Sequence, residues 1–153
     1  MNETLQKITS IWRHIEEVQK NCFILSERLI EAGQDELARQ LITNSLVHDQ
    51  SKFVGIEWEY LHTDDSNMRT FAIRHHQSIN PHHPEYWSGI QNMPDVYLAE
   101  MACDIKARSS EFGTDLRSWI DDVASHKYGF SKRDKVYKKL KKFVNMICQS
   151  PFS

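Results

Sequence analysis

The stretch ITSIWRHIEEVQKNC, residues 8–22, decides the fold class of this chain. Its apolar residues recur every three or four positions, which is the spacing of one helix face: Ile8, Ile11, Ile15, Val18 and Cys22. Successive helix residues turn by about 100°, so His14 lies about 60° from the centre of that face. The stretch therefore predicts a core-facing helix that carries a histidine at the edge of its buried side.

Helical spacing continues through most of the chain, and alternating strand patterns are hard to find. A second apolar stretch covers 22–30 and ends near Gly33, a residue typical of helix ends. Asp35 reads as the cap of the next helix, Pro94 as part of the first turn of a long one, and Gly113 as its end. We predict further helices at about 35–47, 56–61, 67–79, 94–112, 116–123 and 131–148.

Two segments interrupt this pattern. Pro81 and Pro84 bracket His82 and His83, so the backbone there cannot be regular helix. Residues 88–94 read as a loop. No internal repeat or linker appears, and a length of 153 residues suits one domain. The sequence thus predicts an all-α, compact, single-domain helical bundle over residues 1–153.

Composition excludes few functions. Hydrophobic residues make up 40% and charged residues 26%, and the net charge of -2 predicts no particular partner. The basic segment 131–148 has a good apolar stripe, so we prefer an amphipathic helix whose lysines face water to a nucleic-acid footprint. A membrane-surface role is less favoured still. The oligomeric state stays open.

Cysteine usage and the N-terminus bear on location. The three cysteines, Cys22, Cys103 and Cys148, form no CxxC pair, and their odd number favours free thiols in a reducing compartment. They lie on or near apolar stripes, which indicates core positions. Residues 1–10 lack the apolar core of a signal peptide, and no apolar run approaches the length of a membrane span. We expect a cytoplasmic protein, in a bacterium or in a phage-infected host.

Histidines and aspartates carry the chemical signal. The chain has 8 histidines, and four of them lie between positions 75 and 83. Imidazole and carboxylate are ligands that first-row divalent metals prefer. Several such residues fall on separate predicted helices, each on or near an apolar face. In chain order they are His14, His48, Asp49, His75, His76, His82, His83 and Asp104.

This order resembles the HD superfamily of metal-dependent phosphohydrolases, whose pattern is H…HD…D. His14 matches the first histidine, His48 and Asp49 the HD pair, and Asp104 the final aspartate. The added histidines resemble two-metal variants, H…HD…H…HH…D, seen in HD-GYP and cyclic-nucleotide phosphodiesterases. The resemblance implies a helical bundle of the HD-domain type.

The chain is more similar still to a family of small, mostly phage and bacterial HD-like proteins of unassigned function. The segments that carry this likeness are HDQSKF (48–53), HHQSINPHHPEYW (75–87) and LAEMACDIKARSSEF (98–112). The family often has tryptophan after the final aspartate, where this chain has Ile105. Together with His14, these segments cover roughly the first 112 residues.

The resemblance implies two divalent ions. His14, His48, Asp49 and Asp104 would hold one, and Asp49 would bridge to a second. The second would be held by His76, or by its neighbour His75, and by His82 or His83. A bridging carboxylate suits a pair of cations about 3.5–4 Å apart. Manganese, iron, magnesium, zinc, cobalt and nickel remain equally compatible. Glu57, Asn80 and Glu100 are candidates to support these ligands.

Other residues are candidates for substrate. Lys52 resembles the lysine that many HD enzymes direct at a substrate phosphate, and with Asp49 it forms the predicted catalytic pair. Lys106 and Arg108 flank Asp104 and are candidates for a second phosphate. The remaining substrate candidates follow or lie within the histidine loop, and the aromatic ones could stack on a base or wedge the loop onto the core: Asn80, Tyr86 and Trp87.

Three functions fit these residues. The leading hypothesis is metal-dependent hydrolysis of a nucleotide or a related small phosphoester. Some HD-fold proteins with a similar ligand set are di-iron oxygenases, and an oxygenase of that type would use the same ligand types. A non-catalytic protein that sequesters a nucleotide or a host protein is the third. Metal content, oxygen dependence and turnover would separate them.

Overall fold

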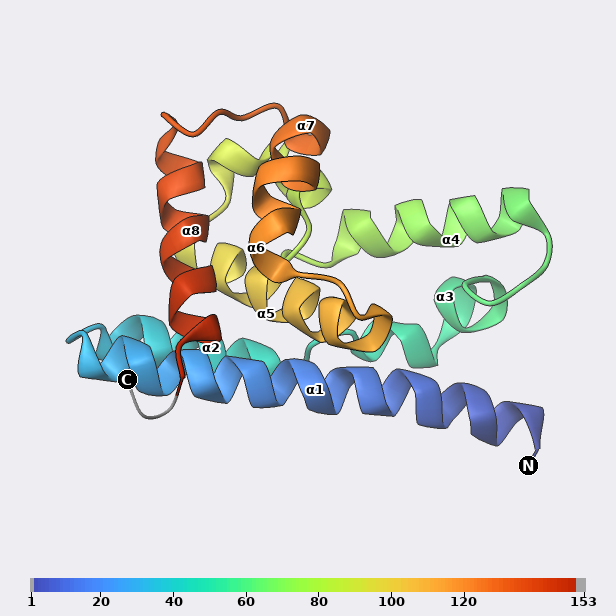
Figure 1. The fold of residues 1–153 in the computed structure, drawn as a ribbon. Coiled ribbons are helices and arrows are strands. Elements are labelled where there is room, and N and C mark those ends of the chain that lie inside the picture. The colour runs from blue at the N-terminus through green and yellow to red at the C-terminus, as the bar shows by residue number, and fades with distance from the viewer. Residues whose placement is uncertain (1, 151–153) are drawn as a thin grey trace.

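The fold is built from helices alone in the computed structural model, which describes residues 2–150 (Figure 1). The elements, in chain order, are α1 (Glu3–Glu31), α2 (Asp35–Ser45), η1 (Gln50–Phe53), α3 (Gly55–Tyr60), α4 (Ser66–Ile79), η2 (Pro84–Trp87), η3 (Ile90–Asn92), α5 (Asp95–Phe112), α6 (Leu116–Ser118), η4 (Trp119–Ala124), α7 (Ser125–Tyr128) and α8 (Lys135–Cys148). The all-α class predicted from the sequence is confirmed for these residues. No described helix has both the length and the apolar character that a membrane crossing requires.

The long helix α1 forms one edge of the molecule (Figure 1). The Asn2 side chain caps it by accepting a hydrogen bond from the Thr4 N–H at 2.8 Å. The stripe quoted above continues without a break through the second apolar stretch, so 8–30 lies in one helix rather than two. Its buried apolar residues all face the core: Ile11, Val18, Cys22, Leu25 and Leu29.

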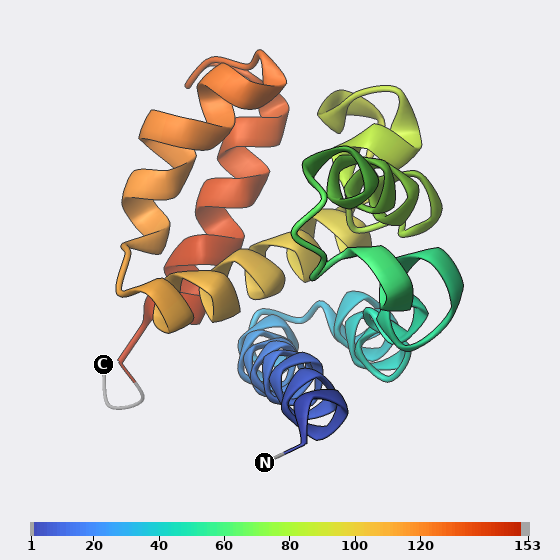
Figure 2. The same ribbon diagram turned by 90° about the vertical axis from the view of Figure 1, so that its right-hand side faces the viewer.

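Helix α5 is the centre of the fold. It packs against α1 and α2 on one side and against α6 and α8 on another (Figure 2). Half of its length is buried, and small residues such as Ala99, Ala102 and Ala107 let neighbouring helices approach closely. Being buried on several sides, α5 shows no clean amphipathic stripe. Asp104 is therefore fixed in the middle of the molecule.

Three helix starts differ from the sequence prediction. Gln34, not Asp35, caps α2, and its carbonyl accepts the Ala38 N–H at 3.0 Å. Pro94 caps α5 from outside the helix. The basic helix begins at Lys135 instead of 131, because 131–134 form a turn in which Asp134 accepts the Ser131 N–H at 2.6 Å. Its end at Cys148 agrees with the prediction.

Two further segments are more helical than predicted. The segment 88–94 contains the short helical turn η3 rather than only loop. The helix expected at 116–123 continues to Tyr128 and is π-helical through η4. The three cysteines are unpaired; Cys22 and Cys103 are fully buried, while Cys148 is half-buried against the core.

Helices α3 and α4 project beyond the α1–α5 core and lie beside the N-terminal half of α1 (Figures 1 and 2). They pack mainly on each other, with α3 also against η1 and α4 against η2. The Lys7 ammonium on α1 lies over the Trp58 ring and donates to the Trp58 carbonyl oxygen. Within α4 the buried residues are Ala72 and His76. The α3–α4 pair thus covers one side of a space that α1 and α5 line from the other.

Candidate metal centre

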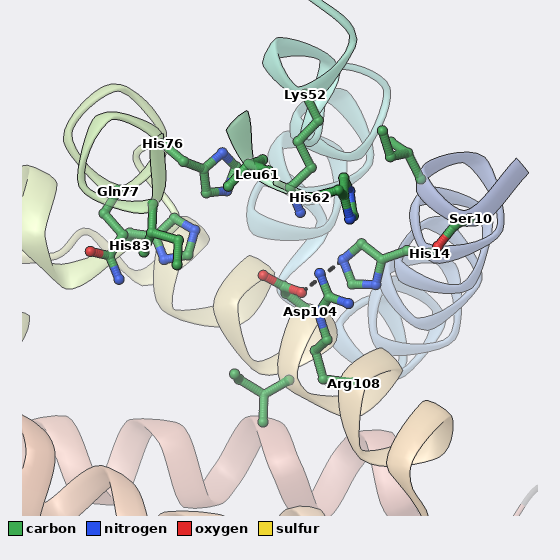
Figure 3. Close-up of a pocket in the computed structure, with 13 residues that line it drawn as sticks. Ser10, His14, Lys52, Leu61, His62, His76, Gln77, His83, Asp104 and Arg108 are labelled. Carbon is green, nitrogen blue, oxygen red and sulfur yellow. Dashed lines mark ion pairs between the residues drawn. The ribbon is translucent and has the colours of Figure 1, made fainter. Parts of the chain in front are cut away.

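The histidines and aspartates predicted as ligands converge at one place between α1, α4 and α5. His14 comes from α1, His76 from α4 and Asp104 from α5, and Figure 3 shows these side chains facing one another across a pocket. The turn after α2 and the loop before η2 bring the others: His48, Asp49, His82 and His83. All are buried except the half-buried His83.

The Asp49 carboxylate lies at the centre of this cluster. Its Oδ1 is 3.2 Å from His76 Nε2 and 3.4 Å from His82 Nε2. Its Oδ2 is 3.5 Å from the Nε2 atoms of both His14 and His48. The two oxygens therefore face two different sets of imidazole nitrogens, on opposite sides of one carboxylate.

The backbone at Asp49 is in the left-handed region, with φ 57 and ψ 15. Few residues other than glycine adopt this conformation, and aspartate and asparagine tolerate it best. It turns the chain sharply between α2 and η1, which directs the side chain into the core, where it is 0% exposed. Backbone strain of this kind concentrates at functional positions.

Three of the histidines each contact a further carboxylate through Nδ1, and each contact involves a different glutamate. His14 Nδ1 is 2.8 Å from Glu111 Oε1, His48 Nδ1 is 2.9 Å from Glu100 Oε1, and His76 Nδ1 is 2.7 Å from Glu57 Oε2. Each Nδ1–H donates to its glutamate, so Nε2 is the ring nitrogen that faces the centre of the cluster. Carboxylates placed in this way orient metal-binding histidines and raise their basicity.

The polar atoms at the centre are the ones that a metal ion would satisfy. Among residues 2–150, the buried side-chain nitrogens and oxygens that form no hydrogen bond are His14 Nε2, His48 Nε2, Asp49 Oδ1, His82 Nε2, His83 Nε2 and Asp104 Oδ1. Two of these atoms, His14 Nε2 and Asp104 Oδ1, face each other at 3.1 Å and form an ion pair when His14 is protonated. Burying unpaired polar atoms is costly, so such a group needs an explanation. Every one of these atoms belongs to a predicted ligand, and the donor set suits a divalent cation.

Ligand atoms also lie close enough together to share an ion. Those of His76, His82 and His83 are within 4.8 Å of one another, as are those of His14, His48 and Asp104. A third group within the same distance joins His48 and His82 to Glu100. The buried residues can therefore hold a metal ion.

The charges of the cluster are strongly coupled. Burial alone would lower the pKa of His14, but Asp104 and Asp49 outweigh it and raise that pKa to about 9. The pKa of Asp49 falls well below its usual range, because His48 and Lys52 outweigh the opposing effect of burial. Burial and the neighbouring histidines lower the pKa of His83 to about 3. Protons on His14 and the Lys52 ammonium thus supply the positive charge that these carboxylates need.

The structure distinguishes between the paired histidines at 75 and 76. His76 points into the cluster, whereas His75 is half-exposed and lies 3.3 Å from Glu57 Oε1. No such distinction separates His82 from His83. The His82 and His83 rings are 4.2 Å apart, and both rings lie at the centre, His82 against Asp49 and His83 against His76.

Comparison with known protein families identifies the family of this chain. Residues 3–150 match the family described as "Family of unknown function (DUF5662)". The chain belongs to that family. No curated protein and no solved structure matches it. The geometry of its buried histidines and aspartates therefore carries the argument for what this DUF5662 protein does.

A cavity of about 320 Å³ opens onto the cluster of the DUF5662 protein (Figure 3). His14, Lys52, His76, His83 and Asp104 line its inner end. Four aliphatic side chains form much of the remaining wall: Ile11, Leu61, Ile73 and Ile105. A cavity of this size, mostly apolar with a few convergent polar groups, suits a small molecule.

The predicted substrate residues divide into two groups. Lys52 and Arg108 line the cavity, and the Lys52 ammonium lies 2.5 Å from Asp49 Oδ2. Lys106, Tyr86 and Trp87 do not line it. Lys106 is two residues beyond Asp104, which turns its side chain to another face of α5. A contact of Lys106 with substrate therefore stays a prediction.

Asn80 and Trp87 hold the histidine loop. The Asn80 amide donates to the His76 carbonyl at 2.8 Å and to Ser51 Oγ at 3.1 Å, so it braces the end of α4. Trp87 Nε1 donates to the Pro81 carbonyl at 2.7 Å, and its ring packs 5.4 Å from Tyr97. Tyr86 is 45% exposed beside Trp87. A contact of these residues with substrate stays a prediction.

Sequence reasoning missed Glu111 and His62. Glu111 is seven residues after Asp104, two helical turns along the same face of α5, so its spacing carried a signal. His62 lines the cavity, and burial together with Lys7, Lys52 and Arg108 lowers its pKa. No sequence motif indicated His62 as a site residue, because it is the turn between α3 and α4 that brings its side chain to the cavity.

Proposed function

We propose that this DUF5662 protein is a metal-dependent phosphohydrolase that acts on a nucleotide or a related small phosphoester. The observation that carries the proposal is the Asp49 carboxylate, whose two oxygens face separate sets of histidine Nε2 atoms. A carboxylate in this position suits a pair of divalent cations. The resemblance to the HD superfamily, argued from motifs, agrees with this geometry.

Under this proposal the two ligand sets share Asp49. One ion would be held by His14, His48, Asp49 and Asp104, and the other by Asp49, His76, His82 and His83. Bound divalent metal would supply a Lewis acid and a water of lowered pKa. Glu57, Glu100 and Glu111 keep the histidine Nδ1 atoms occupied, which holds each ring in one orientation.

Cationic side chains beside the cluster suit a phosphate. The Lys52 ammonium is 9% exposed and lies on the cavity wall next to Asp49. Arg108, one helical turn after Asp104, lines the same cavity from the α5 side, across from Lys52 (Figure 3). Lysine acts on phosphate as a compact point charge and arginine as a fork of donors. The aliphatic side chains that line the cavity would exclude water from the bound ester.

The test is phosphate release from p-nitrophenyl phosphate and from nucleoside monophosphates by the metal-loaded full chain. The key variant is Asp49→Asn, because asparagine tolerates the positive φ at this position. We expect it to lose activity by at least about 100-fold, since metal catalysis supplies several kcal/mol. Asp122→Asn removes an exposed carboxylate elsewhere and should keep full activity.

Lys52→Gln should raise KM more than it lowers kcat, since the lysine is assigned to phosphate binding. Phosphate release that persists in Asp49→Asn at the parent rate would refute the proposal. Oxygen consumption with an iron-loaded protein and no phosphate release would support the di-iron oxygenase instead. Stoichiometric capture of a nucleotide without turnover would support the sequestering protein.

A further inference from the structure

A second cavity, of about 530 Å³, adjoins the cavity at the metal centre. Ser10, His14 and Arg108 line both, so the two cavities meet along these residues and together form a groove beside α1. The outer part runs between α1, with Arg13 and Thr9, and the C-terminal end of α5. The second cavity therefore lies next to the position that a ligand at the candidate metal centre would occupy.

The outer part of the groove is positively charged. Glu111 is the carboxylate that lines it, and both oxygens of Glu111 are engaged, Oε1 by His14 at 2.8 Å and Oε2 by Arg108 at 2.9 Å. Arg13 is exposed and forms no ion pair with any residue of the described range 2–150. One guanidinium in the groove is thus without a carboxylate partner.

Arg108 lies where the two cavities join. A single nitrogen of its guanidinium, Nη1, is used on Glu111, so its other N–H groups remain to donate. Arginine guanidinium groups bind phosphate and carboxylate through paired N–H donors. Arg108 and Arg13 together offer such donors at a position beyond the metal ligands.

We infer that the groove between α1 and the end of α5 binds a second anionic group of the substrate. The substrate class is then a phosphoester that carries a further phosphate or carboxylate, with its scissile phosphate at the metal centre and the other anion on Arg13 and Arg108. This inference rests on the proposed function and narrows its substrate. Arg108 thus keeps the second-phosphate role that the sequence suggested for it and Lys106, and Arg13, on the exposed side of α1, is added to it.

The test measures binding of three phosphonates to the manganese-loaded full chain by calorimetry, with metal content checked afterwards. Ethylphosphonate has one anionic group, phosphonoacetate adds a carboxylate, and methylenediphosphonate adds a second phosphonate. Their C–P bonds are not split by phosphoester hydrolysis, so binding is read without turnover. We expect at least one two-anion probe to bind about tenfold tighter than ethylphosphonate, the effect of one charge-assisted contact.

Arg13→Gln should remove that advantage and leave ethylphosphonate binding within about twofold of the parent. Lys20→Gln removes an equal charge from α1 outside the groove and should leave the advantage intact. Preference for phosphonoacetate identifies a carboxylate as the second anion, and preference for methylenediphosphonate identifies a phosphate.

Equal affinity for all three probes, or no binding of any, overturns the inference. So does an Arg13→Gln effect no larger than that of Lys20→Gln. Hydrolysis of small phosphoesters without a two-anion preference would overturn this inference alone. Arg13-dependent binding of a two-anion probe without any phosphoester hydrolysis would support the groove and contradict the proposed function.

Discussion

Replacing Glu100 with glutamine removes a buried charge behind the histidines of the candidate metal centre. Glu100 is 4% exposed, and its Oε1 accepts the His48 Nδ1–H at 2.9 Å. His82 Nδ1 lies 3.6 Å from the same oxygen, beyond hydrogen-bond range. The substitution keeps the size of the side chain and weakens one charge-assisted hydrogen bond. Loss of such a partner lowers metal affinity by about 10–100-fold, or about 1.4–2.7 kcal/mol.

A smaller effect on folding should accompany it. Oε2 of Glu100 accepts the Asn44 amide at 3.1 Å. In Glu100→Gln, an amide that keeps its oxygen on His48 turns its NH₂ group toward Asn44, so two donors face each other. The lost hydrogen bond destabilises the metal-free protein by about 1 kcal/mol, which lowers Tm by about 2–4 °C in a chain of this size.

Competition with a chromophoric chelator measures the metal affinity, and thermal unfolding of the metal-free protein measures the stability. Glu27→Gln, at an exposed position of α1, removes the same charge and should change neither. A Glu100→Gln variant with unchanged metal affinity but lowered Tm would show that Glu100 is only structural. The assignment of the glutamates as supports for metal-binding histidines would then be wrong.

Three other outcomes follow from the same contacts. Because the pKa of His14 is raised to about 9, a metal ion must displace the His14 proton when it binds. The metal affinity should therefore rise with pH between about 6.5 and 9. Calorimetry in two buffers should find that metal binding to His14→Gln releases about one proton fewer than binding to the parent. Deuterium exchange across Ser66–Ile79 should slow on metal binding in the parent but not in His76→Gln, because α4 buries little besides His76. Trp87→Phe keeps the packing on Tyr97 but loses the bond to Pro81, so Tm should fall by about 2–4 °C.

Helical periodicity was sufficient to predict most elements of the fold. The stripe through Ile11 and Val18 placed α1, and Gly113 marked the end of α5 correctly. Boundaries set by single hydrogen bonds were not predictable in this way. The basic helix starts at Lys135 because the Asp134 side chain closes a turn, which apolar spacing does not encode.

The candidate site was likewise predictable from the sequence only in part. The ordered histidines and aspartates could be named from motifs, since each lies on or beside a helix with a readable face. The choice of His76 over His75 depends on how α4 packs against Glu57 of α3, which is a tertiary contact. Arg13 reads from periodicity as an ordinary exposed residue, and only the approach of the α5 end makes it part of a groove.

Metal content is the measurement that tests the central claim most directly. The chain would be purified without a histidine tag, and bound metals in the parent and in Asp49→Asn would be quantified by elemental mass spectrometry. A carboxylate between two ligand sets predicts about two equivalents in the parent and a marked loss in the variant. No bound metal after reconstitution, or an Asp49→Asn variant that retains the parent's full content, would contradict the account.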